Sequence, residues 1–296
     1  MNVRKRKILR NLEGYLFIAP SYLLMLVFSA FPILFSFYIS FSEWDMISGF
    51  DNIKLIGVKN YVVMWSDIWF RQSLINNLVY TLVVVPVTLV LALLLAVFIN
   101  DYVIGKKLVR LGVFLPHITN IVAISMIWSM LYSKEGPIGH GARMFGIENV
   151  PNFLADKQWA LPSIMVMMIW LSLGYCTLIY IGGLQSVPED LYEAAKIDGA
   201  SWWICLTRIT IPMISPTTFF LLTTQVINSF KVFGPIQMMT QGGPVRATTV
   251  LVYYIYTAAF EFYKFGYASA MAMVLFAIIL ILTIIQWQKQ KQWVNY

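Results

Sequence analysis

This sequence contains few charged residues. Of its 296 residues, 12% are Asp, Glu, Lys or Arg, whereas 59% are hydrophobic. A soluble globular domain carries about 25% charged residues. A chain this apolar cannot cover a water-facing surface with polar groups, so much of its exterior must face lipid.

Cysteine and histidine are also scarce, with two of each, and several common catalytic motifs are absent. Cys176 and Cys205 form no disulfide framework, and His117 and His140 are too far apart in sequence to suggest a zinc pair. The chain has no GxxxxGK[ST] phosphate loop, so it cannot bind ATP in that manner, and it has no HExxH or GxSxG motif. We therefore expect neither an enzyme nor a metal site, and no cofactor bound by this chain.

The net charge of +7 could indicate nucleic-acid binding. The sequence contains no basic stripe on a soluble domain and no nucleic-acid recognition motif. Basic residues are instead typical of the cytoplasmic ends of membrane helices, where they lie beside anionic lipid. We expect a lipid bilayer, and no nucleic acid, as the partner of these charges.

The chain contains long apolar stretches with almost no charge. Each is close to the roughly 20 residues that cross a bilayer as a helix, and lipid offers the backbone no other hydrogen-bond partner. The predicted spans are about 15–41, 74–99, 112–132, 160–183, 213–235 and 266–287. The sequence therefore predicts an all-α polytopic membrane protein: a tail over residues 1–14, then one domain over residues 15–296. The first stretch is too long for a signal-peptide core.

Lysine and arginine set the predicted orientation. With both termini inside, the inner segments hold twelve of these residues and the longer outer loops hold eight. The tail is the most basic segment, with Arg4, Lys5, Arg6, Lys7 and Arg10. Because cytoplasmic segments are enriched in Lys and Arg, both termini are predicted to be cytoplasmic.

Residues 184–212 form the longest inner loop. Ser186 and Glu189 have the spacing of a capping box, Pro188 suits a first helical turn, and Gly199 suits a helix C-terminus. These features predict a short helix over about 187–197, followed by a second stretch that enters the membrane near Pro212.

This loop has the composition of a contact surface. Small residues allow close approach of a partner, acidic residues add charge, and tryptophan supplies a large anchor. The candidate contact residues are Glu193, Ala194, Ala195, Asp198, Gly199 and Trp203. An amphipathic helix that merely connects two spans would fit the same pattern.

Two motifs carry a more specific resemblance. Residues 193–200 (EAAKIDGA), continued through Pro212 and Pro216, resemble the EAA signature of permease subunits of ABC importers. Residues 229–244 (SFKVFGPIQMMTQGGP) resemble the segment that leaves span five in MalF/UgpA-like permeases of the carbohydrate-uptake family. The chain departs from that family at Ile211, usually Leu, and after Phe233, where Asp is common. The resemblance covers the chain from the first span onward.

The resemblance implies a type I ABC importer permease (MetI-like) fold in the bacterial inner or plasma membrane. It implies one half of a translocation path for a sugar or oligosaccharide, and coupling through the loop around residues 193–199. The partners it implies are a second permease subunit, an extracytoplasmic solute-binding protein and two ABC ATPase subunits that bind ATP and Mg²⁺.

Two alternatives stay open. One is an importer for a non-sugar or anionic solute such as a sugar phosphate or uronate. The other is an ion-coupled secondary transporter, although such carriers commonly place acidic groups inside their spans. No Asp or Glu lies within the six stretches here.

Polar residues inside the spans mark a candidate solute path, because they are costly in lipid. The candidates are His117, Asn120, Ser172, Tyr175, Gln225, Asn228, Ser229 and Lys231. The resemblance places all of these except Asn120 and Lys231 on or beside sugar-contacting positions of the family's maltose permease. The same residue types also bond neighbouring helices to one another. Lys231 fits an anionic solute or a side chain that reaches the outer surface.

Overall fold

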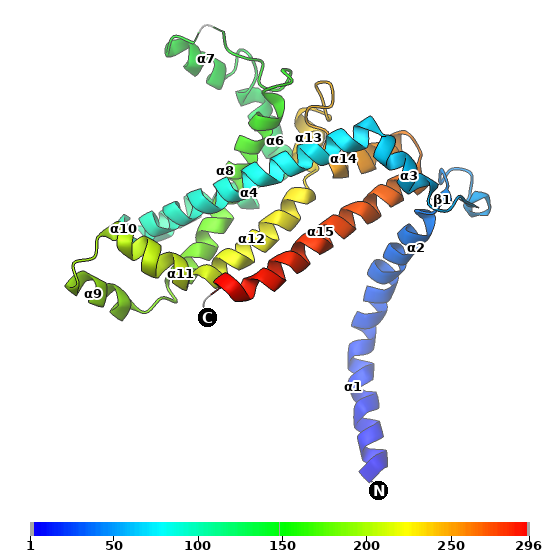
Figure 1. The fold of residues 1–296 in the computed structure, drawn as a ribbon, viewed down its shortest axis with the longest axis horizontal. Helices are drawn as coiled ribbons and strands as arrows, with labels where there is room; N and C mark the ends of the chain where they lie inside the picture. Colours follow the sequence, from blue (N-terminus) through cyan, green and yellow to red (C-terminus); the bar gives the residue numbers. More distant parts are fainter. Residues whose placement is uncertain (1–2, 148, 295–296) are drawn as a thin grey trace. The chain divides into compact units, whose positions relative to one another are not determined.

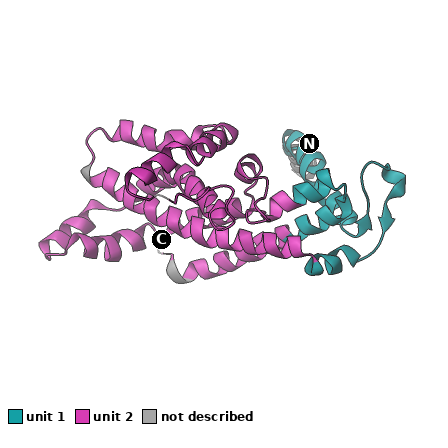
Figure 2. Ribbon diagram, turned by 90° about the horizontal axis from the view of Figure 1, so that it is seen from above, with its two compact units in different colours: residues 1–66, 255–274 teal, residues 67–254, 275–296 magenta. Residues whose placement is uncertain are grey.

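The computed structural model describes residues 3–147 and 149–294, and the described chain is mostly helical (Figure 1). It divides into two compact units (Figure 2). Unit 1 comprises residues 1–66 and 255–274, and unit 2 comprises residues 67–254 and 275–296. The helices α14 (Leu251–Tyr256) and α15 (Phe265–Trp293) each contribute to both units.

Unit 1 is built from a long N-terminal helix and a small segment of short strands and helices. Its elements are α1 (Val3–Met25), the π-helical turn η1 (Leu26–Ala30), α2 (Phe31–Ile39), β1 (Ser42–Glu43), the 3₁₀ turn η2 (Phe50–Asn52), β2 (Lys54–Leu55), α3 (Lys59–Ser66) and the π-helical turn η4 (Thr257–Glu261). The two strands pair antiparallel. The start of α15 lies directly on β1, because a Cβ at Gly266 would stand 1.9 Å from the Ser42 carbonyl oxygen.

Unit 2 holds the remaining helices. They are α4 (Ile68–Tyr102), α5 (Lys106–Ile118), α6 (Ile121–Leu131), α7 (Pro137–Met144), α8 (Ala160–Leu184), α9 (Glu189–Ile197), α10 (Trp202–Cys205), the π-helical turn η3 (Leu206–Thr210), α11 (Ile211–Met213), α12 (Ser215–Phe230) and α13 (Gly234–Met239). Helix α8 is central to the unit, since it packs against α4, α5 and α12.

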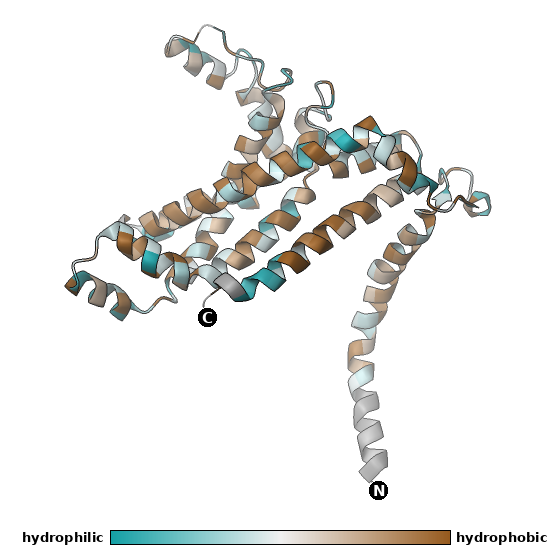
Figure 3. Ribbon diagram, in the orientation of Figure 1, coloured by the Kyte–Doolittle hydropathy of each residue, from teal (hydrophilic) through white to brown (hydrophobic). Residues whose placement is uncertain are grey.

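Four continuous helices are long and apolar enough to cross a membrane. They cover Gly14–Ile39, Ile68–Asp101, Ala160–Leu184 and Phe265–Lys291, and Figure 3 shows hydrophobic residues along most of α4 and α15. Two further candidates are bent pairs: Lys106–Ile118 with Ile121–Leu131 at 96°, and Trp202–Met213 with Ser215–Met239 at 68°. The predicted count of six is reached when each bent pair is one span.

The bends follow from local chemistry that the apolar stretches conceal. Helix α5 ends where Thr119 is extended, and the Asn120 Oδ1 then accepts the Val122 N–H at 2.8 Å, which starts α6 in a new direction. Near the other bend, Pro216 lies in the first turn of α12, where a proline costs no hydrogen bond. The ranges 112–132 and 213–235 are therefore not single continuous helices.

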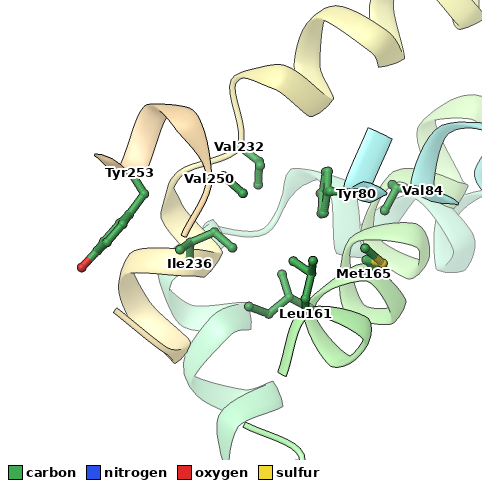
Figure 4. Packing of buried hydrophobic residues seen from close by; sticks show 9 residues of the cluster. Tyr80, Val84, Leu161, Met165, Val232, Ile236, Val250 and Tyr253 are labelled. Carbon is green, nitrogen blue, oxygen red and sulfur yellow. The ribbon is translucent and has the colours of Figure 1, made fainter. Parts of the chain in front are cut away.

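A buried apolar cluster joins several of these helices. Tyr80 and Val84 of α4 and Leu161 of α8 pack with Val232 and Ile236, on either side of the start of α13 (Figure 4). Figure 4 also shows Tyr253 of α14 at the edge of the cluster, with its hydroxyl directed away. The cluster fixes α13 and α14 against α4 and α8.

Candidate functional site

A cavity of about 570 Å³ lies within unit 2, between α4, α5, α8 and α12. Its volume is within the range of about 300–1,000 Å³ that is typical of small-molecule sites. Its polar lining residues other than Tyr80 are His117, Thr119, Ser172, Tyr175, Thr224, Gln225, Asn228 and Ser229.

Helical spacing explains why these side chains converge. On α8, Met168, Ser172 and Tyr175 recur at intervals of three and four residues, and all three line the cavity. On α12, Gln225 and Asn228 are three residues apart and line it from the other side. Residues at these intervals share one face of a helix, so one face of each helix lines the cavity.

A glycine brings two aromatic rings of the cavity together. A Cβ at Gly174 would stand 2.0 Å from the Val113 carbonyl oxygen, so only glycine lets α8 lie directly on the α5 backbone. This close approach places the His117 imidazole on the Tyr175 ring, with centroids 4.9 Å apart and planes 21° apart. The pair forms a flat aromatic surface in the cavity wall.

The polar side chains on α12 differ in their hydrogen bonds. The Gln225 Nε2 donates to the Cys176 Sγ at 2.8 Å, which orients the amide, and among the described residues its Oε1 accepts no hydrogen bond. Ser229 is 5% exposed, and its hydroxyl bonds to the Thr81 Oγ1 at 2.9 Å and to the Val226 carbonyl at 2.7 Å. Ser229 therefore joins α12 to α4 as well as lining the cavity.

Six of the eight predicted path residues line this one cavity, and Asn120 and Lys231 do not belong to its lining. Asn120 caps α6, and Lys231 is an exposed residue that ends α12. The sequence analysis missed Thr119 and Thr224. Thr224 lies four residues before Asn228 on α12, and this spacing, which places both on one helix face, was a signal that could have identified it.

Residues 184–212 contain the short helix that the sequence predicts. Helix α9 spans Glu189–Ile197, and Gly199 follows it with φ +72°. The Gly199 N–H donates to the Lys196 carbonyl at 3.1 Å and the Ala200 N–H to the Ala195 carbonyl at 2.8 Å. This is the Schellman arrangement, in which a glycine in the left-handed conformation ends a helix.

The predicted capping box at the start of this helix is wrong. The Ser186 hydroxyl donates backward to the Gly183 carbonyl at 2.7 Å, and Pro188 is the N-cap residue without a side-chain cap. The helix is instead tied to the next segment by the Tyr192 hydroxyl, which lies 2.9 Å from the Thr210 Oγ1 of η3. The next helix, α10, has a Ser201 cap.

The candidate contact residues of this loop lie largely in the open. Glu193, Ala194, Asp198 and Gly199 are exposed, Ala195 is half-buried, and Trp203 is 62% exposed. Ile197, on the last turn of α9, is 86% exposed. Among the described residues, no group of three His, Cys, Asp or Glu side chains is placed to hold a metal ion.

Residues 64–290 match the family described as the binding-protein-dependent transport system inner membrane component. The chain belongs to this family. It is therefore a permease component of a transport system, in agreement with the MetI-like fold expected from the sequence, and a component of the inner membrane.

Curated relatives match nearly the whole chain. The lactose transport system permease protein LacF of Rhizobium radiobacter is 33% identical over 267 residues, with 88% of each chain covered. The sn-glycerol-3-phosphate transport system permease protein UgpA of Agrobacterium fabrum is 31% identical over 284 residues, covering 95% of this chain and 96% of the relative.

A solved structure shares the fold. It is a bacterial alginate ABC transporter in complex with an alginate pentasaccharide-bound periplasmic protein, with a TM-score of 0.83 and 24% identity over 97% of this chain and 96% of the matched chain.

Proposed function

We propose that this chain is a transmembrane permease subunit of an ATP-driven importer that receives a sugar or oligosaccharide from a solute-binding protein. The cavity carries this proposal. It combines neutral hydrogen-bonding groups on Ser172, Gln225 and Asn228 with the stacked face of His117 and Tyr175. Neutral polar groups beside an aromatic face suit the hydroxyls and the apolar ring faces of a sugar.

The relatives support the solute class. The names of LacF and UgpA refer to lactose and to sn-glycerol-3-phosphate. An anionic solute is the second candidate, because glycerol phosphate is among these names. The described lining contains no Lys, Arg, Asp or Glu side chain, and Lys231 is not part of it. We therefore favour a neutral saccharide.

The inner loop supports the coupling role. A short helix with a glycine-terminated end and an exposed surface of small, acidic and aromatic residues can occupy a groove in another protein. In this proposal α9 is a coupling helix that docks on an ABC ATPase subunit and transmits its closure to α12 through η3. ATP and Mg²⁺ are bound by two such ATPase subunits, and a second permease subunit supplies the other half of the path.

The topology completes the proposal. Both termini and α9 lie in the cytoplasm, and the segments that follow α6 and α13 face the solute-binding protein. The twelve basic residues of the inner segments support this orientation.

Uptake and ATP hydrolysis by the whole importer in proteoliposomes test the proposal. We expect Gly199→Val and Glu193→Lys to insert normally but to reduce uptake per ATP hydrolysed by about 5- to 150-fold, the usual size of a coupling between sites. Gly57→Val is the matched control, because Gly57 also has a positive φ and open space around it. Normal transport by both inner-loop variants would count against the assignment.

A further inference from the structure

The loop between α13 and α14, residues 240–250, is bonded extensively to itself. The Thr240 and Thr248 hydroxyls lie 2.7 Å apart, and the Thr248 hydroxyl also donates to the Gly243 carbonyl at 2.7 Å. The Thr249 hydroxyl donates to the Gly242 carbonyl at 2.9 Å. These side chains satisfy backbone groups that would otherwise need water, so the loop has a defined conformation.

Hydrogen bonds from helix α4 also hold this loop. The Asn76 Nδ2 donates to the Arg246 carbonyl at 2.9 Å and to the Thr249 carbonyl at 2.8 Å, and Gln72 orients that amide by donating to its Oδ1 at 2.9 Å. Both anchor points lie in unit 2. The tip of the loop is therefore fixed to a membrane-spanning helix.

The tip has an unusual backbone. Val245 and Arg246 have φ values of +46° and +65°, in the left-handed region that a β-branched residue rarely adopts. Such conformations persist only where the surrounding contacts enforce them, and they cluster at functional sites.

This backbone places the Arg246 side chain on an aromatic stack. The Arg246 Cζ lies 4.9 Å from the centroid of the Trp69 ring, and that ring stacks on Tyr254 at 5.8 Å. The Asp67 carboxylate accepts hydrogen bonds from the Tyr254 hydroxyl and from the Trp69 backbone N–H, so it fixes the Tyr254 side chain beside the start of α4. Among the described residues, no carboxylate lies within ion-pair distance of Arg246.

We propose that Arg246 is an anchor for a carboxylate on the extracytoplasmic solute-binding protein. The inference rests on the proposed function, which supplies that partner and places the loop on the outer side. Arg246 is half-buried, with the indole against its face. The N–H edges of a stacked guanidinium match a carboxylate in a bidentate pair. Val245 beside it is 73% exposed and adds apolar contact area. Arg246 does not line the solute cavity.

The test is the affinity of the assembled importer, in nanodiscs, for the solute-binding protein encoded beside it. We expect Arg246→Gln to raise the Kd at least about tenfold and to flatten its salt dependence, because one charge pair is lost. Arg246→Lys should give an intermediate Kd, because lysine keeps the charge but loses the stack and the fork. The control is Arg143→Gln, since Arg143 already pairs with Glu135 at 3.2 Å.

Each outcome discriminates. A Kd within about twofold of the wild type for Arg246→Gln, or an equal change for Arg143→Gln, overturns the proposal. A raised KM for solute at saturating binding protein, with an unchanged Kd, would instead assign Arg246 to the solute. If Arg246→Gln fails to fold, the Arg246→Lys Kd decides. If the binding protein does not stimulate the wild-type ATPase at all, the proposed function fails rather than the docking site.

Discussion

The loop of residues 240–250 and the loop of residues 185–201 are attached to unit 2 in different ways. Residues 240–250 bond to themselves and to Asn76 of α4, and the segment that follows is fixed by the Asn77 Oδ1, which accepts the Leu251 N–H at 3.2 Å. For residues 185–201, the described side-chain bond from α9 to another element is the one between Tyr192 and Thr210.

This difference matches the two proposed roles. A surface that receives a docking partner gains affinity from being formed beforehand. A helix that transmits motion needs internal rigidity but must move relative to its neighbours. The Schellman end at Gly199 keeps α9 intact. Among the described residues, one side-chain hydrogen bond, at Tyr192, joins α9 to another element, which leaves the helix free to shift as one piece. We therefore expect changes in residues 240–250, the outer loop of the proposal, to cost stability. Changes in residues 185–201 of the inner loop should cost coupling.

The largest effect is expected for Asn77→Leu. This change leaves the buried Leu251 N–H and the buried Ser229 carbonyl without the side-chain partner that each has now. Leaving a buried polar group unpaired costs about 1–3 kcal/mol, so the change should destabilise unit 2 by about 2–5 kcal/mol. Thermal unfolding of the purified chain in detergent measures this.

Asn228→Leu is the matched control for that experiment. Asn228 is exposed to the cavity, and its side chain makes no hydrogen bond among the described residues, so its loss should affect uptake but not unfolding. Equal unfolding temperatures for Asn77→Leu and the wild type would show that the outer loop is not held in the way described.

A pair of glycine variants tests the same comparison, with an effect on stability of intermediate size. Gly242 and Gly199 have nearly equal φ values, +77° and +72°. A Cβ at Gly242 would stand 2.6 Å from the Tyr253 ring and 2.8 Å from the Thr249 Oγ1, whereas one at Gly199 meets nothing within 4 Å. In both alanine variants the left-handed backbone conformation costs about 1–2 kcal/mol, but only in Gly242→Ala does the new Cβ also clash with neighbouring atoms.

Gly242→Ala should therefore lower the free energy of unfolding by about 1–3 kcal/mol more than Gly199→Ala does. Chemical denaturation of the two variants, run in parallel, measures the difference. If the two losses were equal, the crowding around Gly242 would be irrelevant and the outer loop no more constrained than the inner one.

The sequence predicts best what depends on neighbours along the chain. The apolar stretches predict the four continuous helices, and Gly199 predicts the end of α9 because a helix C-terminus is a local event. The bend at Asn120 was missed, since one side-chain cap outweighs the apolar character of the whole stretch 112–132. The prediction for the start of α9 was wrong because the Ser186 hydroxyl donates to the Gly183 carbonyl and does not cap the helix.

The same distinction between local and long-range information applies to the candidate site. The cost of polar residues in lipid is visible in the sequence, and it identified six of the polar residues that line the cavity. Lys231 carries the same signal but ends α12 outside the cavity lining, and only the three-dimensional arrangement separates it from Asn228. The fixed outer loop was not predictable, because its anchor Asn76 lies 170 residues from Arg246.

The smallest effect on stability is expected for Tyr192→Phe. This variant tests whether the hydrogen bond between Tyr192 and Thr210 transmits the motion of α9. The change removes one half-buried hydrogen bond, worth about 0.5–1.5 kcal/mol, and leaves the ring in place. Global unfolding should barely change, whereas amide hydrogen exchange over residues 189–197 should accelerate by about 2- to 13-fold, since local opening becomes easier by that free energy. Tyr22→Phe, at an exposed position, is the control. Faster exchange together with reduced uptake per ATP would show that the tether transmits motion. Faster exchange with normal coupling would show that it only holds α9 in place, and coupling would then have to pass through the backbone of residues 198–210.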